Sequence, residues 1–237
     1  TLRVQVDDAE GLEGVAVDAL GRSLTHQVNV DKSISGYREI TIIVVRDSND
    51  TTVMIGGTED MEPVGIHTAD SLSVMPIQTL PDPVIQRLRN AAFTVATGFG
   101  IQGVLEVRFA VGPEGDDYVI TRVTPYYDRT SALVAAATGY PLVPVMASLM
   151  LGETLENVHI PSVFAKHTAL LEPTMDHIVI RFPVFPFGEL EAAGHHTERR
   201  LNTIQKSVGA TIGVGRSIEE ALEKAIRAAH FNNRSFT

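Results

Sequence analysis

The chain contains the stretch ITIIVVRDSNDTTVMI at residues 40–55. Apolar and mostly β-branched residues fill positions 40–45 and 52–55, and the DSND segment at 47–50 between them is typical of a turn. This order predicts a β-hairpin. Because the first run is apolar on both faces, we expect the sheet that contains it to be covered on both sides.

The elements that follow this hairpin do not alternate regularly between strand and helix. Apolar spacing predicts helices at residues 81–98, 130–138 and 142–151, and alternation predicts strands at 105–111, 118–123 and 178–182, with a loop at 157–173. A capping box, Ser217-Ile218-Glu219-Glu220, starts a last helix. The order favours an α+β fold with a largely antiparallel sheet flanked by helices.

The two ends of the chain carry weaker patterns. Residues 1–21 begin with alternating apolar positions and become acidic and glycine-rich, so we expect a short or weakly ordered start. A glycine run, Gly209, Gly213 and Gly215, predicts turn geometry. We therefore divide the chain into an N-terminal segment at 1–26, a main domain at 27–231 and a frayed tail at 232–237.

Composition excludes several classes of protein. The 237 residues include 19 Lys plus Arg against 29 Asp plus Glu, a net charge of −10, which argues against nucleic acid as a partner. The absence of cysteine excludes disulfides and a cysteine nucleophile, and fits a cytoplasmic location. No apolar run is long enough for a membrane span, and no signal peptide is visible. The first residue, Thr1, indicates a chain that is processed or excised from a longer protein.

Two polar clusters are candidates for chemistry. The sequence GIHTADS at residues 65–71 is compatible with a ligand-contact loop and with an ordinary polar turn. The sequence DRTS at 128–131 precedes a predicted helix, where it is compatible with a plain N-cap or with an anion site at the helix amides. The adjacent His195 and His196 do not face one site, which favours a solvated loop over a metal site.

Taken in order, several motifs resemble the large chain of carbamoyl phosphate synthetase. They are DKSISGYRE at 31–39, VVRD at 44–47, GIHTADS at 65–71, PIQTL at 76–80, SAL at 131–133, ATGYP at 137–141, KSVG at 206–209 and GRS at 215–217. The match runs from about Ser23 to about His230. It is nearest to the C-terminal portion of the first of that chain's two ATP-grasp halves, which phosphorylates bicarbonate.

This resemblance implies an ATP-grasp fold, ATP as a cofactor and the chemistry of an ATP-dependent ligase. Residues 1–26 would be a remnant of the preceding ATP-grasp subdomain. The phosphate lid and the second ATP-grasp half of the family do not occur in this sequence. We expect this chain alone to be inactive.

The resemblance also assigns site residues. Glu39 matches a ribose contact of the family, residues 65–68 match its nucleotide-side loop, and the conserved arginine of the following motif is Arg129, which we assign a catalytic role. The family's other hinge acid corresponds to Lys32. The nucleotide-binding candidates are Ile34, Glu39, Gly65, Ile66, His67 and Thr68.

The magnesium site of the family is altered. The Gln, Glu and Asn that hold the ion correspond to Arg108, Arg122 and Thr124, and a following arginine corresponds to Tyr126. Magnesium requires oxygen ligands, which arginine does not offer. We therefore expect no magnesium to bind, and no carboxyphosphate to form by the family mechanism.

Two arrangements remain open for Arg108 and Arg122. They pair with local carboxylates such as Glu106 or Asp128, or they point into the old phosphate site and bind phosphate oxygens directly. Three functions remain open with them. These are a degenerate structural, interaction or regulatory module, a ligase piece that needs missing segments or a synthetase-type partner subunit, and a magnesium-independent nucleotide or anion sensor. A second copy of this chain also remains open as a partner.

Overall fold

The computed structural model describes residues 4, 6–115, 117–160 and 167–229, and the chain divides into two units, Thr1–Ser35 and Gly36–Thr237. The first unit contains helix α1 (Ala9–Arg22), which begins where the Asp8 side chain accepts a hydrogen bond from the Gly11 amide at 2.7 Å. No residue of α1 is buried. The sequence analysis missed this helix because it has no apolar stripe that a helical pattern would reveal.

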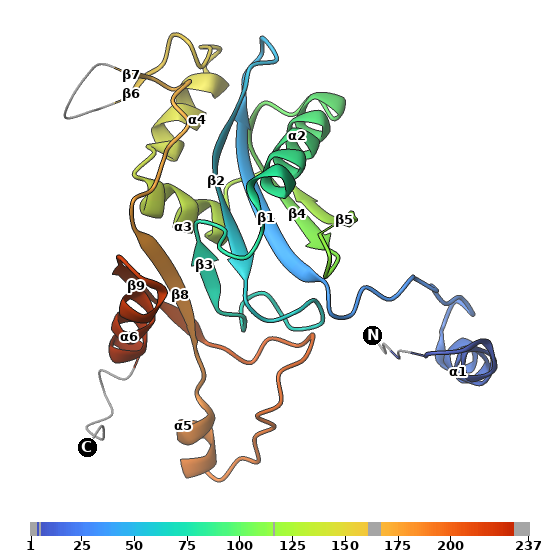
Figure 1. Cartoon of the computed structure of the whole chain (residues 1–237). Helices are drawn as coiled ribbons and strands as arrows, with labels where there is room; N and C mark the ends of the chain where they lie inside the picture. The colour runs from blue at the N-terminus through green and yellow to red at the C-terminus, as the bar shows by residue number, and fades with distance from the viewer. Residues whose placement is uncertain (1–3, 5, 116, 161–166, 230–237) are drawn as a thin grey trace. The chain divides into compact units, whose positions relative to one another are not determined.

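The second unit is built on a seven-stranded sheet (Figure 1) with the strand order β5-β4-β1-β2-β3-β8-β9, in which every neighbouring pair is antiparallel. The predicted α+β class is confirmed. The strands are β1 (Arg38–Arg46), β2 (Thr52–Asp60), β3 (Ser73–Met75), β4 (Gly103–Val111), β5 (Tyr118–Thr124), β8 (Ile178–Val184) and β9 (Gly209–Gly215). A separate pair, β6 (His159–Ile160) and β7 (His167–Thr168), lies within the expected loop.

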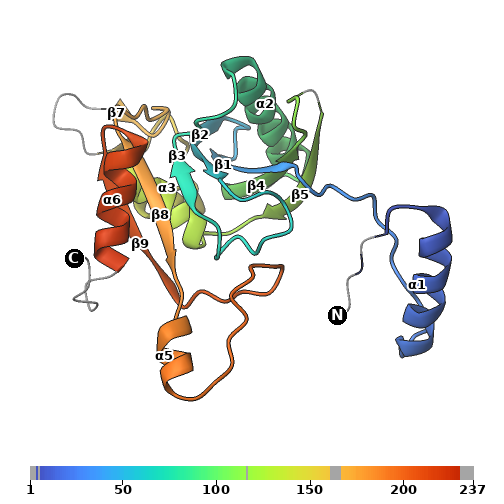
Figure 2. The same cartoon turned by 60° about the horizontal axis from the view of Figure 1, so that its bottom comes forward.

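Helices cover both faces of the central strands. Helix α2 (Asp82–Gly98) packs on one face, where Leu88 meets Ile42, while α3 (Arg129–Thr138) and α4 (Leu142–Met150) pack on the other, where Val134 meets Ile43. Figure 2 shows α2 and α3 on opposite sides of the sheet. The neighbouring residues Ile42 and Ile43 belong to different cores, one on each face of the sheet. This explains why the apolar run at residues 40–45 has no polar face.

The far edge of the sheet is covered by α6 (Ile218–Ala229), which packs on β8 and β9. The predicted cap is confirmed at Ser217, whose Oγ accepts from the Glu220 amide at 3.2 Å, while the Glu220 carboxylate reaches back to the Arg216 amide at 2.8 Å instead of the Ser217 amide. The turn predicted from the glycine run is wrong, because residues 209–215 form strand β9. A Cβ on Gly213 would lie 1.9 Å from the Ala221 carbonyl oxygen, so glycine is needed for α6 to approach the strand.

Other boundaries agree closely with the sequence analysis. The helices predicted at 81–98, 130–138 and 142–151 are α2, α3 and α4, and a short helix α5 (Phe187–Ala192) was not expected. The expected tail at 232–237 lies outside the described residues. Within the described part of the chain no single helix is long and apolar enough to cross a membrane, although the bent pair α3 and α4 passes that test by length and composition.

Candidate functional site

The positions that the resemblance assigns to the metal site lie side by side on the β4–β5 hairpin. Arg108 of β4 is directly opposite Arg122 of β5, and Glu106 is directly opposite Thr124. Directly opposed residues of antiparallel strands present their side chains to the same face of the sheet. The three positions that the resemblance assigns to metal ligands therefore lie together on one face of the hairpin, and two of them carry guanidinium groups.

Arg108 is held by two carboxylates. Its Nη2 lies 3.0 Å from Glu106 Oε1, and its Nη1 lies 3.4 Å from Glu39 Oε1 and donates to Thr68 Oγ1 at 2.8 Å. Thr68 Oγ1 in turn donates to Glu39 Oε1 at 3.1 Å. The side chains of Arg108, Glu39 and Glu106 are 14%, 13% and 1% exposed, so this network is screened little by solvent. Local pairing is the arrangement that Arg108 adopts.

Arg122 differs from Arg108 in its surroundings. It is exposed, and its side chain makes no hydrogen bond or ion pair with the described residues. The structure thus brings two predicted nucleotide contacts, Glu39 and Thr68, together around Arg108 and leaves Arg122 facing solvent.

Glu106 is a buried carboxyl with a second acid beside it. Burial raises the pKa of Glu106, the neighbouring carboxylate of Asp128 raises it further, and the positive charge of Arg108 opposes both effects. Asp128 also caps α3, since its Oδ1 accepts from the Thr130 amide at 2.8 Å. The N-cap interpretation of the DRTS cluster is therefore correct for Asp128.

Two of the acids around the hairpin are paired with Arg108. Among the described residues, no three His, Asp or Glu side chains gather in a way that could hold a metal ion. Glu39 and Glu106 both contact the Arg108 guanidinium. The single positive charge of Arg108 therefore offsets one of the two negative charges that these carboxylates carry when ionised.

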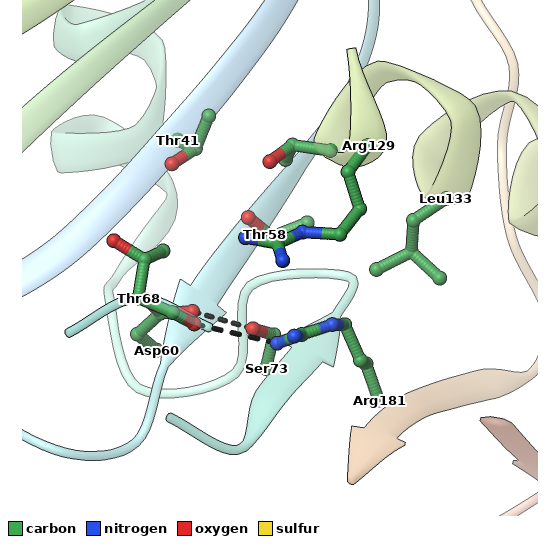
Figure 3. Close-up of a pocket in the computed structure, with 9 residues that line it drawn as sticks. Thr41, Thr58, Asp60, Thr68, Ser73, Arg129, Leu133 and Arg181 are labelled. Atoms are coloured by element: carbon green, nitrogen blue, oxygen red, sulfur yellow. Dashed lines mark hydrogen bonds between the residues drawn. The ribbon is translucent and has the colours of Figure 1, made fainter. Parts of the chain in front are cut away.

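Arg129 lies in a second group of charged residues next to this network. Figure 3 shows Arg129 from α3 and Arg181 from β8 extending into one small pocket. The Asp60 carboxylate accepts from Ser73 Oγ at 2.6 Å, and burial raises the pKa of Asp60 to about 7. Burial lowers the pKa of Arg181, and the neighbouring charge of Arg129 lowers it further. The pocket is lined by Thr41, Thr58, Asp60, Thr68, Ser73, Arg129, Thr130, Leu133 and Arg181.

The predicted nucleotide-side loop lies beside the same network. Gly65 has φ +120°, a conformation that side-chain-bearing residues rarely adopt. The His67 amide donates to the Asn202 carbonyl at 2.8 Å, and His67 Nδ1 lies 3.2 Å from the Ala69 amide. Ile66 is half-buried in this loop, and Ile34 is half-buried in the N-terminal unit.

Sequence reasoning missed Asp60, Ser73 and Arg181. Asp60 and Ser73 are 13 positions apart and Arg181 is 110 positions beyond Ser71, so no local pattern could join them. The apolar run that ends in Glu59 and Asp60 carried a weak signal, since two acids at the end of a buried strand need partners.

Comparison with known sequences defines the family. The sequence model described as "Carbamoyl-phosphate synthase L chain, ATP binding domain" matches residues 3–158. The chain belongs to this family. A carbamoyl phosphate synthase large chain from Methanothrix thermoacetophila is 42% identical over 219 residues, and one from Thermomicrobium roseum is 38% identical over 224 residues. These alignments cover 92% and 94% of this chain and 20% of each relative, so the chain spans about a fifth of their length.

Solved structures of the ATP-grasp type support the fold. A biotin carboxylase from Campylobacter jejuni in complex with β-γ-ATP aligns with TM-score 0.56 at 16% identity, over 76% of this chain and 38% of that chain. The biotin carboxylase domain of a single-chain bacterial carboxylase aligns with TM-score 0.55 at 20% identity, over 73% of this chain and 37% of that chain. The expected ATP-grasp-like fold is thereby confirmed.

Proposed function

We propose that this chain is a degenerate ATP-grasp region of the carbamoyl-phosphate synthase large-chain family. It acts as a structural, interaction or regulatory module and does not carry out magnesium-dependent phosphoryl transfer. The observation that supports this most is the Arg108 guanidinium between Glu39 and Glu106, at 3.4 and 3.0 Å. We place the module in the cytoplasm, with a second copy or a synthetase-type subunit as its partner.

The charge balance of the hairpin argues against the family mechanism. Two arginines in place of a glutamine and a glutamate change the local charge by about +3. A divalent ion about 4 Å from one such charge meets a repulsion on the order of 8 kcal/mol at an effective dielectric near 20. Solvent reduces this figure for exposed Arg122, and the paired carboxylates Glu39 and Glu106 reduce it for Arg108. Phosphoryl transfer needs the metal to neutralise developing charge. A repulsion that weakens metal binding therefore also slows phosphoryl transfer.

The direct test is ATP cleavage by the purified chain, with bicarbonate and with or without magnesium. We expect no magnesium-dependent release of ADP above the rate of a blank. The matched variant is Arg108→Gln/Arg122→Glu/Thr124→Asn, which restores the ligand types of the family and should gain magnesium-dependent ATP binding. Metal-dependent cleavage by the unaltered chain contradicts the proposal and favours the ligase activity that the names of the longer relatives describe.

A magnesium-independent nucleotide or anion sensor is the second candidate, and exposed Arg122 favours it. A guanidinium without an internal partner among the described residues is available for phosphate oxygens. Arg129 and Arg181 add two further positive charges in the adjacent pocket. Arg122→Glu should weaken the binding of magnesium-free ATP about tenfold, the effect of losing one charged hydrogen bond. Unchanged affinity in this variant removes the sensor from consideration.

A further inference from the structure

A buried hydrogen-bond network holds the nucleotide-side loop from behind. We call Asp70, Arg181 and Ser207 the loop clamp; their residues are 1%, 7% and 6% exposed. Arg181 Nη2 donates to the Ala69 carbonyl at 2.9 Å, and its Nη1 lies 3.3 Å from the carbonyls of Thr68 and Ser71. One guanidinium from β8 therefore holds three backbone carbonyls of the loop within four residues, those of Thr68, Ala69 and Ser71.

The other half of the clamp comes from the segment before β9. The Asp70 carboxylate accepts from the amides of Lys206 and Ser207, both at 2.8 Å, and Ser207 Oγ donates to the Ala69 carbonyl at 3.1 Å. Burial acts to raise the pKa of Asp70, but the hydrogen bonds from Ser207 and Lys206 outweigh it, so the pKa is lowered. The charged form of Asp70 is thus the form that the clamp binds.

The clamp meets the candidate site at Thr68. The carbonyl of Thr68 accepts from Arg181, while its hydroxyl contacts Glu39 and Arg108. A shift of the loop backbone therefore moves the Thr68 hydroxyl away from Glu39. The excursion at residues 184–206, which leads from β8 to the clamp, contains no buried residue. It reaches the loop through its Asn202 carbonyl and Lys206 amide.

We propose that Asp70 and Arg181 are positioning residues that hold the loop at 65–68 in its ligand-binding conformation. Through them the exposed excursion at 184–206 sets the affinity of the site for a nucleotide. This inference rests on the proposal that the loop contacts a nucleotide. It adds a physical link between a surface segment and that site, carried by hydrogen bonds to loop carbonyls and to one buried carboxylate.

The test compares Asp70→Asn with a matched variant, Asp47→Asn. Asp47 is also 1% exposed and also accepts backbone amides, from Asn49, Thr51 and Leu155 at 2.9 Å, but it lies in the β1–β2 turn. Both variants should lower the midpoint of thermal unfolding, because each loses acceptor capacity for buried amides. Titration with magnesium-free ATP should show a Kd about tenfold higher or more for Asp70→Asn, and about unchanged for Asp47→Asn.

Hydrogen exchange supplies a second readout in the absence of nucleotide. Amides of the loop at 65–71 should exchange faster in Asp70→Asn, while those at 47–51 keep their wild-type rates. Should Asp70→Asn fail to fold, Ser207→Ala removes the bond to the Ala69 carbonyl and should still weaken ATP binding severalfold.

The outcomes separate this inference from the function on which it rests. Wild-type affinity in a folded Asp70→Asn chain overturns the positioning role alone. Equal losses of affinity in Asp70→Asn and Asp47→Asn also overturn it, since a general loss of stability then explains both. A wild-type chain that binds no ATP overturns this inference together with the sensor function.

Discussion

Arg108→Gln removes a guanidinium that two carboxylates share. Glu39 and Glu106 would then lie close together without a compensating cation, with side chains 13% and 1% exposed. Breaking a buried ion pair by removing one partner costs about 3–5 kcal/mol, because the other charge is left buried. For a chain of this length that corresponds to a fall of roughly 6–20 °C in the midpoint of thermal unfolding.

The cost should depend on pH in a defined direction. Burial and Asp128 already raise the pKa of Glu106 above its ordinary value of 4.5, and Arg108 opposes this rise. Without Arg108 the pKa rises further, so the folded variant holds a proton that the unfolded chain releases. Stability is then retained at pH 4.5 and below and is lost as the pH rises toward the folded value. The deficit of Arg108→Gln relative to wild type should grow between pH 5 and pH 8.

Urea unfolding of the two chains at pH 5 and pH 8 measures this difference. The control is Arg122→Gln, which removes an exposed arginine on the opposite strand and should change the free energy of unfolding by about 0.5 kcal/mol or less. A deficit for Arg108→Gln that is below about 1 kcal/mol and equal at both pH values refutes the reasoning. It would mean that Arg108 is not the internal cation of the site.

Two further substitutions test the buried carboxyl group of Asp60 and the close packing of helix α6 on strand β9. Burial raises the pKa of Asp60 from 3.8 to about 7, so wild type should lose on the order of 4 kcal/mol of stability as the pH rises from about 4 to about 7. Asp60→Asn should remove this loss, so in denaturant unfolding at pH 8 the variant should be more stable than wild type. Equal stability of the two chains at pH 8 would count against a protonated Asp60 in the folded protein. Gly213→Ala should destabilise by about 3 kcal/mol or more, since its Cβ would lie 2.6 Å from the Ala225 amide as well as against Ala221. Gly209→Ala, which has open space, should be nearly neutral, and matching thermal midpoints for the two would show that α6 does not pack closely on β9.

The fold was largely predictable because most elements carry a local pattern. The double-sided apolar run of β1 and the helical spacing of α2 follow from what each buries. Strand β9 was missed because glycines are typical of turns, and the sequence does not show that α6 packs so closely on this strand that Gly213 and Gly215 leave no room for a Cβ. Helix α1 was missed because it buries nothing and so leaves no apolar period.

Residues of the candidate site could be proposed from the sequence where they belong to a continuous sequence motif. The loop at 65–68, Glu39 and the altered hairpin were all identified by resemblance, and the structure brings Glu39, Thr68 and Arg108 into contact. The pairing of Arg108 was left open, because a sequence does not show which carboxylate lies nearest. The clamp through Arg181 could not be predicted, since its contacts join residues more than 100 positions apart.

Calorimetric titration of ATP into the purified chain, with and without magnesium, tests the central claim most directly. The account predicts that magnesium changes neither the affinity nor the heat beyond what magnesium binding to ATP itself explains, because the Arg108 guanidinium already pairs with Glu39 and Glu106. Binding of ATP that appears only when magnesium is present would contradict it, and would show that a metal site survives in this chain.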